Sequence, residues 1–276
     1  MEVLFEMVDG VDSVDNADTG KINPKACVHS VHNVHSVHCL GRKCAAWGVH
    51  LLTAAGAVVG LMAIIAIARH QWLLAFAWMA VTIAIDSVDG MCARACRVKE
   101  VLPHFDGALL DNIVDYFTYV IVPASFLYET HSVPTGFNLI SAMLILLASA
   151  YQFCQIDAKT KDHCFKGFPS YWNVVAFYLF MLDWPEWVNL AIIAALAIGV
   201  FLPVKYLYPS RTRLFRPLNM VLTALWGGAL VAAMFQYPSG HRTLVYASLA
   251  YVGYYFVMSA YLTAKGIHER GDDSAE

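Results

Sequence analysis

Eight long apolar runs occupy most of the chain after residue 45. They cover residues 46–68, 71–92, 107–128, 136–155, 169–184, 187–208, 216–236 and 241–263. A membrane-spanning helix needs about 20 apolar residues, and a chain in lipid must satisfy its backbone hydrogen bonds internally. The composition agrees, because 59% of the residues are hydrophobic and only 14% are charged. The pattern predicts an all-α integral membrane protein, a polytopic bundle of about eight transmembrane helices.

The positive charges sort to one side of this predicted bundle. All but two of the 18 Lys and Arg residues precede the first run, lie in the second, fourth and sixth connections, or follow the last run; the exceptions are Arg69 and Arg242. Cytoplasmic segments of membrane proteins carry an excess of Lys and Arg. We therefore expect both termini to be cytoplasmic. Nothing in the sequence predicts a nucleic-acid partner.

The N-terminal tail is repetitive and polar. It contains the tract VHSVHNVHSVH, with histidines three residues apart at His29, His32, His35 and His38. A zinc or copper tract is one interpretation, but a period of three drifts around a helix, and low-complexity disorder is the favoured one. The expected organisation is a cytoplasmic tail over 1–44, a membrane domain over 45–265 and a short cytoplasmic tail over 266–276.

Four aspartates lie in two pairs between the second and third runs. Asp86 and Asp89 are three residues apart, and Asp111 and Asp115 are four apart, so each pair shares one face of a helix. Carboxylates in apolar sequence cost a few kcal/mol each, and four at one depth repel one another unless cations lie between them. Hard divalent ions such as Mg²⁺ or Mn²⁺ take carboxylate and phosphate oxygens. The aspartates therefore predict a metal site between two helices at the cytoplasmic side.

A metal site of this kind suits a substrate with a phosphate end and a lipid end. Bound ions would clamp a diphosphate while a carboxylate takes a proton from an attacking hydroxyl. The base must be a group that is not wholly committed to metal, and Asp115, one turn deeper than Asp111, is the candidate. Arg94 is the candidate phosphate ligand. Small residues beside the carboxylates leave room for a ligand or a close helix at Gly90, Ala93 and Gly107.

These residues carry a resemblance to a known family. The pattern is an aspartate, two residues, Asp-Gly, two residues, Ala-Arg, a spacer, then Gly, Asp and Asp at intervals of four; it is filled by Asp86, Asp89, Gly90, Ala93, Arg94, Gly107, Asp111 and Asp115. It resembles the signature of the CDP-alcohol phosphatidyltransferases. The spacer is longer than is usual in the family. That spacer, the AWGVHLLTAAG segment and the FKGFPSYWN segment look like the bacterial phosphatidylcholine synthase branch.

The resemblance implies a reaction, a set of roles and a location. CDP-diacylglycerol and choline would give phosphatidylcholine and CMP. Asp86, Asp89, Asp111 and Asp115 would bind Mg²⁺ or Mn²⁺, with Asp115 also the base, and Gly90, Ala93, Arg94 and Gly107 would hold the cytidine diphosphate. It also implies six core helices plus two at the C-terminal end, a homodimer, and a multi-pass protein of the bacterial inner membrane with its active site facing the cytoplasm.

Aromatic residues near the predicted site suit choline. A quaternary ammonium donates no hydrogen bond, so aromatic faces hold it. The candidate choline-binding residues are Tyr116, Tyr119 and Trp172. Tyrosine and tryptophan also collect at every membrane interface, so a purely interfacial role is the alternative for each.

Two other functions fit parts of the pattern. Another acceptor, such as serine, glycerol phosphate or inositol phosphate, would call for an additional basic cluster, for which segments 159–166 and 211–216 supply the lysines and arginines. A cation-coupled transporter would place charges near the bilayer midplane and show internal repeats. We find no repeat between the two halves, and the aspartates cluster at the cytoplasmic end.

Overall fold

The computed structural model describes residues 24–273 except 157, 159, 161–163, 210, 211, 213 and 214, with side chains from residue 41 to residue 265. The chain divides into Met1–Cys44 and a helical unit, Ala45–Glu276. The His29, His32, His35 and His38 side chains lie outside the described residues. Helix α1 begins at Pro24, so residues expected to belong to a disordered tail are helical from there on.

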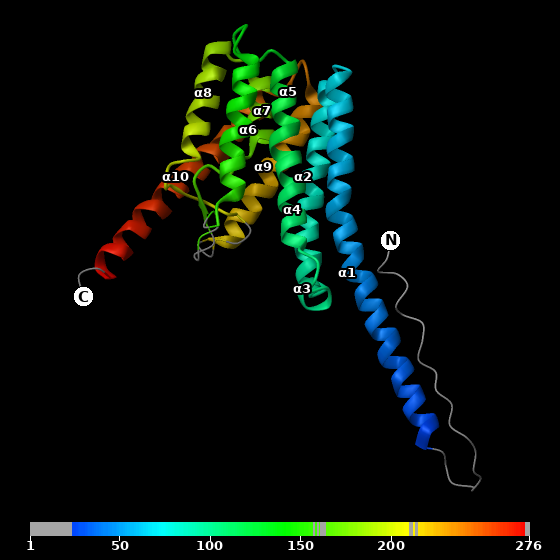
Figure 1. The fold of residues 1–276 in the computed structure, drawn as a ribbon. Helices are drawn as coiled ribbons and strands as arrows, with labels where there is room; N and C mark the ends of the chain where they lie inside the picture. The colour runs from blue at the N-terminus through cyan, green and yellow to red at the C-terminus, as the bar shows by residue number, and fades with distance from the viewer. Residues whose placement is uncertain are drawn as a thin grey trace. The chain divides into compact units, whose positions relative to one another are not determined.

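Helices make up nearly all of the described structure (Figure 1). The first half contains α1 Pro24–Ala68, α2 Trp72–Ala95, α3 Val98–Val101, α4 Gly107–Asp115, η1 Tyr116–Ile121, α5 Val122–Glu129 and α6 Asn138–Cys154. The second half contains β1 Phe165–Lys166, α7 Trp172–Leu182, α8 Glu186–Gly199, β2 Lys205–Tyr206, α9 Arg216–Gln236 and α10 His241–Asp273. The two short strands pair antiparallel, Phe165 opposite Tyr206.

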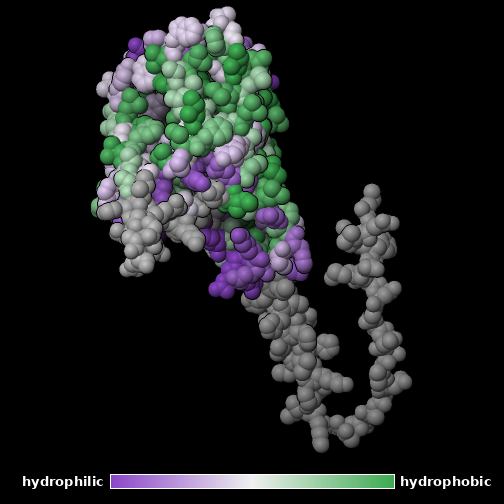
Figure 2. Space-filling model, turned by 60° about the vertical axis from the view of Figure 1, so that its left-hand side comes forward, coloured by the Kyte–Doolittle hydropathy of each residue, from purple (hydrophilic) through white to green (hydrophobic). Residues whose placement is uncertain are grey.

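Four of the described helical segments are long and apolar enough to cross a membrane. They are Gly41–Ala68, Trp72–Ala95, Arg216–Gln236 and His241–Lys265. Shorter apolar helices cover Asn138–Cys154, Trp172–Leu182 and Glu186–Gly199. Figure 2 shows apolar side chains over most of one face of the helical unit. The protein is therefore a helical membrane protein, and the count of eight spans stays a prediction.

The third apolar run forms one uninterrupted helical rod through α4, η1 and α5. Its middle, η1, is a π-helix that directly follows Asp115. Pro123, at the start of α5, has no amide proton to give to the carbonyl of Tyr119, so the turn before it widens instead of continuing α-helical bonds. The predicted range of 107–128 agrees closely with the observed Gly107–Glu129.

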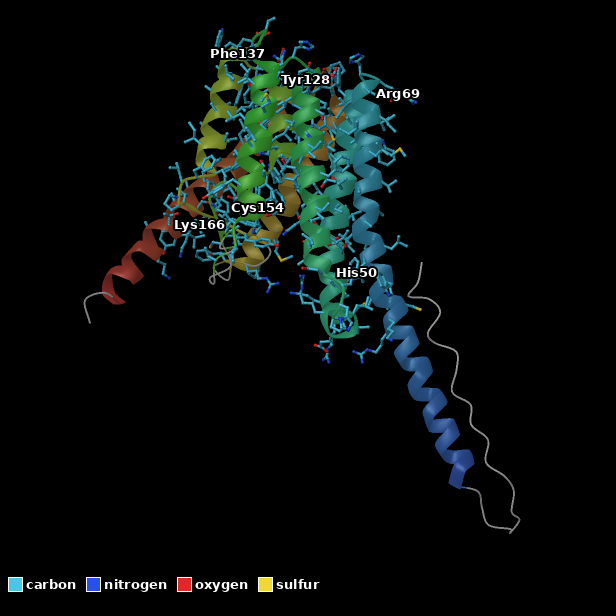
Figure 3. The ribbon with its side chains drawn as sticks, in the orientation of Figure 1. His50, Arg69, Tyr128, Phe137, Cys154 and Lys166 are labelled. Carbon is cyan, nitrogen blue, oxygen red and sulfur yellow. The ribbon has the colours of Figure 1, made fainter. Side chains whose placement is uncertain are left out.

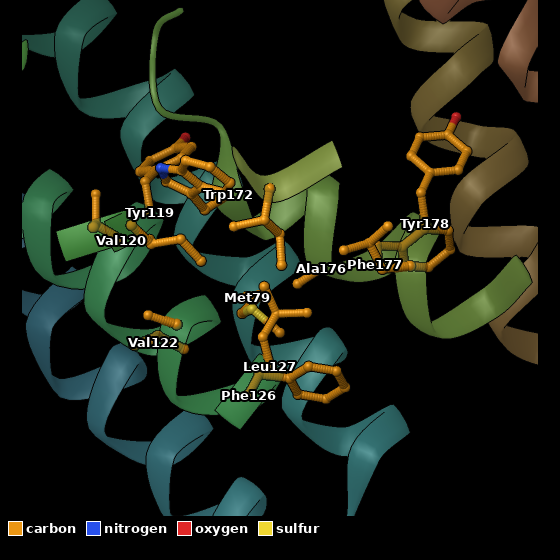
Figure 4. Packing of buried hydrophobic residues seen from close by; sticks show 14 of the residues in the cluster. Met79, Tyr119, Val120, Val122, Phe126, Leu127, Trp172, Ala176, Phe177 and Tyr178 are labelled. Carbon is orange, nitrogen blue, oxygen red and sulfur yellow. The ribbon is translucent and has the colours of Figure 1, made fainter. Parts of the chain in front are cut away.

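Helix α7 lies at the centre of the core. It is short, and most of its side chains are buried, including Trp172, Ala176 and Phe177. They belong to the same buried cluster as residues of α5 such as Phe126, several of which are labelled in Figure 4. The burial of these side chains shows that this short apolar run is packed against other helices over most of its surface.

The sixth run was wrongly expected to remain helical to residue 208. Helix α8 ends at Gly199, and Lys205–Tyr206 forms strand β2. Pro203 lacks an amide proton, so it cannot extend the helix. The Gly167 amide donates to the carbonyl of Val204, which fixes this segment against the β1 strand.

The connections divide between two ends of the bundle (Figure 3). His50, Cys154 and Lys166 lie toward one end, and Arg69, Tyr128 and Phe137 lie toward the other. The first set belongs to the end that carries the aspartates, and we call it the carboxylate end. The second set marks the far end.

Candidate metal centre

Helix α2 supplies two carboxylates at its C-terminal part. Asp89 is buried, only 4% exposed, and Asp86 is half-buried. The helix ends at Ala95, and Arg97, directly before α3, adopts a left-handed conformation with φ of 49°. The chain then turns back through α3 toward the start of α4.

Asp106 fixes the start of the helix that carries the second pair of aspartates. Its carboxylate oxygen accepts hydrogen bonds from the backbone amides of Ala108 and Leu109, both at 3.0 Å. This is an N-cap, which satisfies amides that have no partner inside the helix. One and a half turns later α4 presents Asp111. The sequence reasoning assigned Asp106 no role, although an aspartate directly before an apolar helix is a recognisable cap signal.

Three carboxylates from the two helices meet. One oxygen each from Asp86, Asp89 and Asp111 lies within 4.8 Å of the others. At such separations each pair of charges repels by roughly 3 kcal/mol or more at an effective dielectric constant near 20. An all-oxygen, all-anionic donor set fits a hard divalent cation such as Mg²⁺ or Mn²⁺. The predicted convergence of these three aspartates is thus present in the structure.

Asp115 faces the same place from one turn deeper. It lines a cavity of about 10 Å³ together with Asp86 and Asp89, and with the threonines Thr53 and Thr82. A space of this size holds about one water molecule. Asp115 is outside the group of three close carboxylates, whereas the sequence predicted all four aspartates as metal ligands.

Tyr119, in η1, reaches across to α2. Its hydroxyl donates a hydrogen bond of 2.8 Å to Oδ2 of Asp86. Its ring lies 6.2 Å from the ring of Tyr171, between centroids. Both phenols are within electrostatic range of Asp86 and Asp115. Two aromatic side chains therefore border the carboxylates. Tyr171 was not among the predicted site residues, although it is part of the aromatic FKGFPSYWN segment.

The other two aromatic candidates have partners elsewhere in the bundle. The Tyr116 hydroxyl donates to the carbonyl of Leu146 at 3.0 Å. Trp172 is fully buried, and its indole nitrogen donates to Oγ of Ser149 at 2.8 Å.

The small residues of the motif make space for larger neighbours. A Cβ at Gly107 would collide with the His50 ring, so the bare glycine lets α1 approach the start of α4. A Cβ at Gly90 would lie 3.4 Å from a guanidinium nitrogen of Arg94, which folds back beside the helix. Arg94 is exposed and Ala93 is half-buried. The Nε2 atom of His50 is buried and has no hydrogen-bond partner among the described residues.

The basic residues considered for another acceptor are incompletely described. Lys159, Lys161, Arg211 and Arg213 lie outside the described residues. Lys166 belongs to strand β1, and Arg216 is the first residue of helix α9.

Fold and site together define a class of protein. The chain is a helical membrane protein in which carboxylates from two helices converge at one end of the bundle, as a divalent-metal site requires.

Comparison with known proteins gives the family. Residues 49–204 match the family model of the CDP-alcohol phosphatidyltransferases, and the chain belongs to this family. It is 43% identical to the "Phosphatidylcholine synthase" of Legionella pneumophila, over 79% of this chain and 89% of that protein. It is 39% identical to the protein of that name from Pseudomonas aeruginosa, with the same two coverages. The identity is 36% to that of Borreliella burgdorferi, over 80% of this chain and 95% of the relative.

Proposed function

We propose that this protein transfers the phosphatidyl group of CDP-diacylglycerol to the hydroxyl of choline and releases CMP. The observation that carries the proposal is the convergence of Asp86, Asp89 and Asp111 within 4.8 Å in the family's motif. The relatives named phosphatidylcholine synthase match over most of their length, which supports choline as the acceptor. Membership of the family supports a transferase that depends on a divalent metal.

Asp86, Asp89 and Asp111 are the proposed ligands of Mg²⁺ or Mn²⁺. When bound, the ion neutralises the diphosphate of the substrate and the charge that moves onto the leaving CMP. The Tyr119 hydroxyl donates to Oδ2 of Asp86 at 2.8 Å, which fixes this carboxylate beside Asp89 and Asp111. The cavity among the carboxylates has room for about one ion, so the nucleotide must bind outside it.

Asp115 is the proposed general base. It accepts the proton of the choline hydroxyl while the choline oxygen bonds to the phosphorus next to diacylglycerol. The bond from that phosphorus to the oxygen of CMP breaks, and CMP leaves with the electron pair of that bond. Asp115 lines the same cavity as Asp86 and Asp89 but lies outside the group of three close carboxylates, which supports its role as the base. A base needs to lie near the reacting hydroxyl without being saturated by metal. Asp115 would then share in metal binding only through one oxygen.

The nucleotide is proposed to bind at Gly90, Ala93, Arg94 and Gly107. Arg94 is exposed on the last turn of α2, where its guanidinium can pair with a phosphate of the substrate. The fit of His50 against Gly107 holds α1 beside this surface. The unpartnered Nε2 of His50 offers the nucleotide one further hydrogen bond.

Choline is proposed to bind against the rings of Tyr119 and Tyr171. These phenols border Asp86 and Asp115, so the trimethylammonium would lie on aromatic faces while its hydroxyl reaches the base. Tyr116 and Trp172, the other predicted residues, would support the positions of Tyr119 and Tyr171. Tyr116 lies in the same helical rod as Tyr119, and Trp172 directly follows Tyr171.

The proposed topology has eight spans in the bacterial inner membrane, with both termini and the carboxylates facing the cytoplasm. The uninterrupted rod Gly107–Glu129 and the three shorter apolar helices support the four spans beyond those that qualify by length. The Lys and Arg distribution supports the orientation. A homodimer stays a prediction from the family resemblance.

A panel of acceptors tests the proposed function. Purified protein is supplied with CDP-diacylglycerol, Mn²⁺ and choline, serine, glycerol phosphate or inositol phosphate, and the lipid product is identified by mass spectrometry. We expect phosphatidylcholine and an equal amount of CMP with choline alone. A product with one of the anionic or zwitterionic acceptors instead of choline would contradict the proposal.

A further inference from the structure

A second cavity lies at the far end of the bundle. It has a volume of about 420 Å³ and shares no lining residue with the cavity at the aspartates. Three connections form it: the one after α5, the one between α7 and α8, and the one between α9 and α10. Its lining includes Asp183, Glu186, Asn189, Tyr237, His241 and Arg242. Neither the family motif nor the proposed reaction gives this cavity a role.

Asn189 presents an acceptor without a donor. Its side-chain nitrogen donates to the carbonyl of Ser132 at 2.8 Å and lies 3.4 Å from that of Trp184. Because both partners are carbonyls, the nitrogen and oxygen of the amide are assigned without ambiguity. The residue is only 3% exposed, and its Oδ1 has no hydrogen-bond partner among the described residues.

His241 presents a second acceptor of the same kind. Its Nε2 lies 3.0 Å from the carbonyl of Met181, so this nitrogen carries the proton. In the neutral ring Nδ1 is then an acceptor. His241 is 5% exposed, and its Nδ1 has no partner within the part of the chain that the structure describes. Two buried acceptors in one cavity wall call for a ligand that brings hydrogen-bond donors.

The charges and rings around these acceptors favour a cationic donor. The carboxylates of Asp183 and Glu186 line the cavity, and the only cation within 4.0 Å of either among the described residues is Arg242, 3.7 Å from Asp183. That pair is exposed, so it holds neither partner strongly. The rings of Phe180 and Tyr237, 5.7 Å apart, add aromatic faces. An ammonium with N–H groups can donate to the two buried acceptors and pair with the carboxylates. Arg242 can then bind a phosphate.

The surroundings favour a lipid as the source of that ammonium. Trp187, next to Glu186, is 64% exposed, and its ring lies 5.6 Å from the half-exposed ring of Phe137. Exposed aromatic side chains at the end of a membrane bundle mark the level of the lipid headgroups. A cavity of 420 Å³ is also far larger than a free two-carbon amine, but it admits a headgroup with its phosphate and glycerol.

We propose that the far-end cavity binds the headgroup of an aminophospholipid, with the primary ammonium at Asn189, His241 and Glu186 and the phosphate at Arg242. A trimethylated headgroup lacks the N–H donors that the two buried acceptors require. The site therefore distinguishes a phosphoethanolamine headgroup from a phosphocholine headgroup.

The test compares two lysolipids on the full-length protein in detergent without CMP. Lysophosphatidylethanolamine, lysophosphatidylcholine and free ethanolamine are titrated into wild-type protein, Glu186→Gln and the control Glu129→Gln. Glu129 is an acid at the same end that does not line the cavity. Any binding at the aspartates is common to all three proteins, so only the difference between them reports on the far end.

We expect Glu186→Gln to weaken lysophosphatidylethanolamine binding about tenfold, the effect of losing one hydrogen bond to a charged group. Binding of lysophosphatidylcholine should not change, nor should any affinity of Glu129→Gln. The proposal is overturned if Glu186→Gln binds lysophosphatidylethanolamine as wild type does. It is also overturned if free ethanolamine binds as tightly, because the ligand would then be a soluble amine.

Discussion

At the scale of single residues, small differences of position separate the aspartates proposed to bind metal from the aspartate proposed as the base. Asp86, Asp89 and Asp111 bring oxygens within 4.8 Å of one another, whereas Asp115 lies one turn deeper along the same rod. Three clustered charges stabilise a cation, and the remaining carboxylate lies outside this group, where it can accept a proton.

The substitution Asp115→Asn tests the role of Asp115 as the base. It keeps the shape of the side chain but removes the base, so we expect choline-dependent CMP release to fall about a hundredfold or more while the protein still folds. Radiolabelled CMP release by protein in detergent, with gel filtration as the folding control, makes the comparison. Turnover close to that of the wild type would remove Asp115 from the mechanism.

Substitutions of Tyr171 separate the contribution of its aromatic ring to choline binding from the contribution of its hydroxyl group. In Tyr171→Phe the aromatic face remains, and we expect a KM for choline close to that of the wild type. In Tyr171→Leu the face is lost, and the KM for choline should rise roughly threefold to thirtyfold, the range of a cation–π contact.

The KM for CDP-diacylglycerol serves as the internal control for both Tyr171 variants. It should stay constant, because the nucleotide is proposed to bind along α2 and α4. An equal rise in both KM values in Tyr171→Leu would show a general disturbance instead of a choline contact.

At the scale of the elements, glycines of α1 set how closely the first helix approaches α4 and η1. A Cβ at Gly60 would lie 2.6 Å from the Phe117 ring, and one at Gly56 would lie 2.9 Å from Val114. The two glycines are four residues apart, a spacing that lets membrane helices pack closely. This contact holds α1 against the rod that carries Asp111 and Asp115.

Gly60→Ala tests this contact. The added methyl group must displace the ring, and we expect a loss of about 1 to 3 kcal/mol in stability, seen as a lower melting temperature in detergent. Gly227→Ala in α9 is the matched control, because nothing lies within 4 Å of its Cβ. If both variants have the melting temperature of the wild type, the close approach of α1 is not important for stability.

Much of this arrangement could be predicted from local sequence. The spacing of the aspartates placed each pair on one helical face, and some apolar runs gave their helices to within a few residues, as with 107–128 for the third. The π-helix and the Tyr119 to Asp86 bond could not be predicted, because both depend on how the turn before Pro123 widens. The end of α8 at Gly199 depends on pairing with a strand some forty residues earlier.

At the scale of the whole molecule, the account depends on which end of the bundle faces the cytoplasm. The aspartates and Cys154 belong to one end, and Arg69 belongs to the other (Figure 3). Because the sequence assigns nearly all the lysines and arginines to the tails and to the connections on the side of the aspartates, we expect that end to be cytoplasmic.

Labelling of single cysteines tests the orientation. In a background without other cysteines, Arg69→Cys should react with a membrane-impermeant maleimide in spheroplasts. The native Cys154, which is exposed in the structure, should react only after the membrane is broken. Labelling of Cys154 in sealed spheroplasts would reverse the orientation and place the site where no cytoplasmic nucleotide lipid could reach it.

The most direct test of the central claim is a titration of purified protein with Mn²⁺ followed by electron paramagnetic resonance. The account predicts that wild-type protein binds the ion and that Asp86→Asn combined with Asp111→Asn abolishes this binding, because each helix then loses a ligand. Unchanged Mn²⁺ binding in the double variant would contradict a metal centre between α2 and α4.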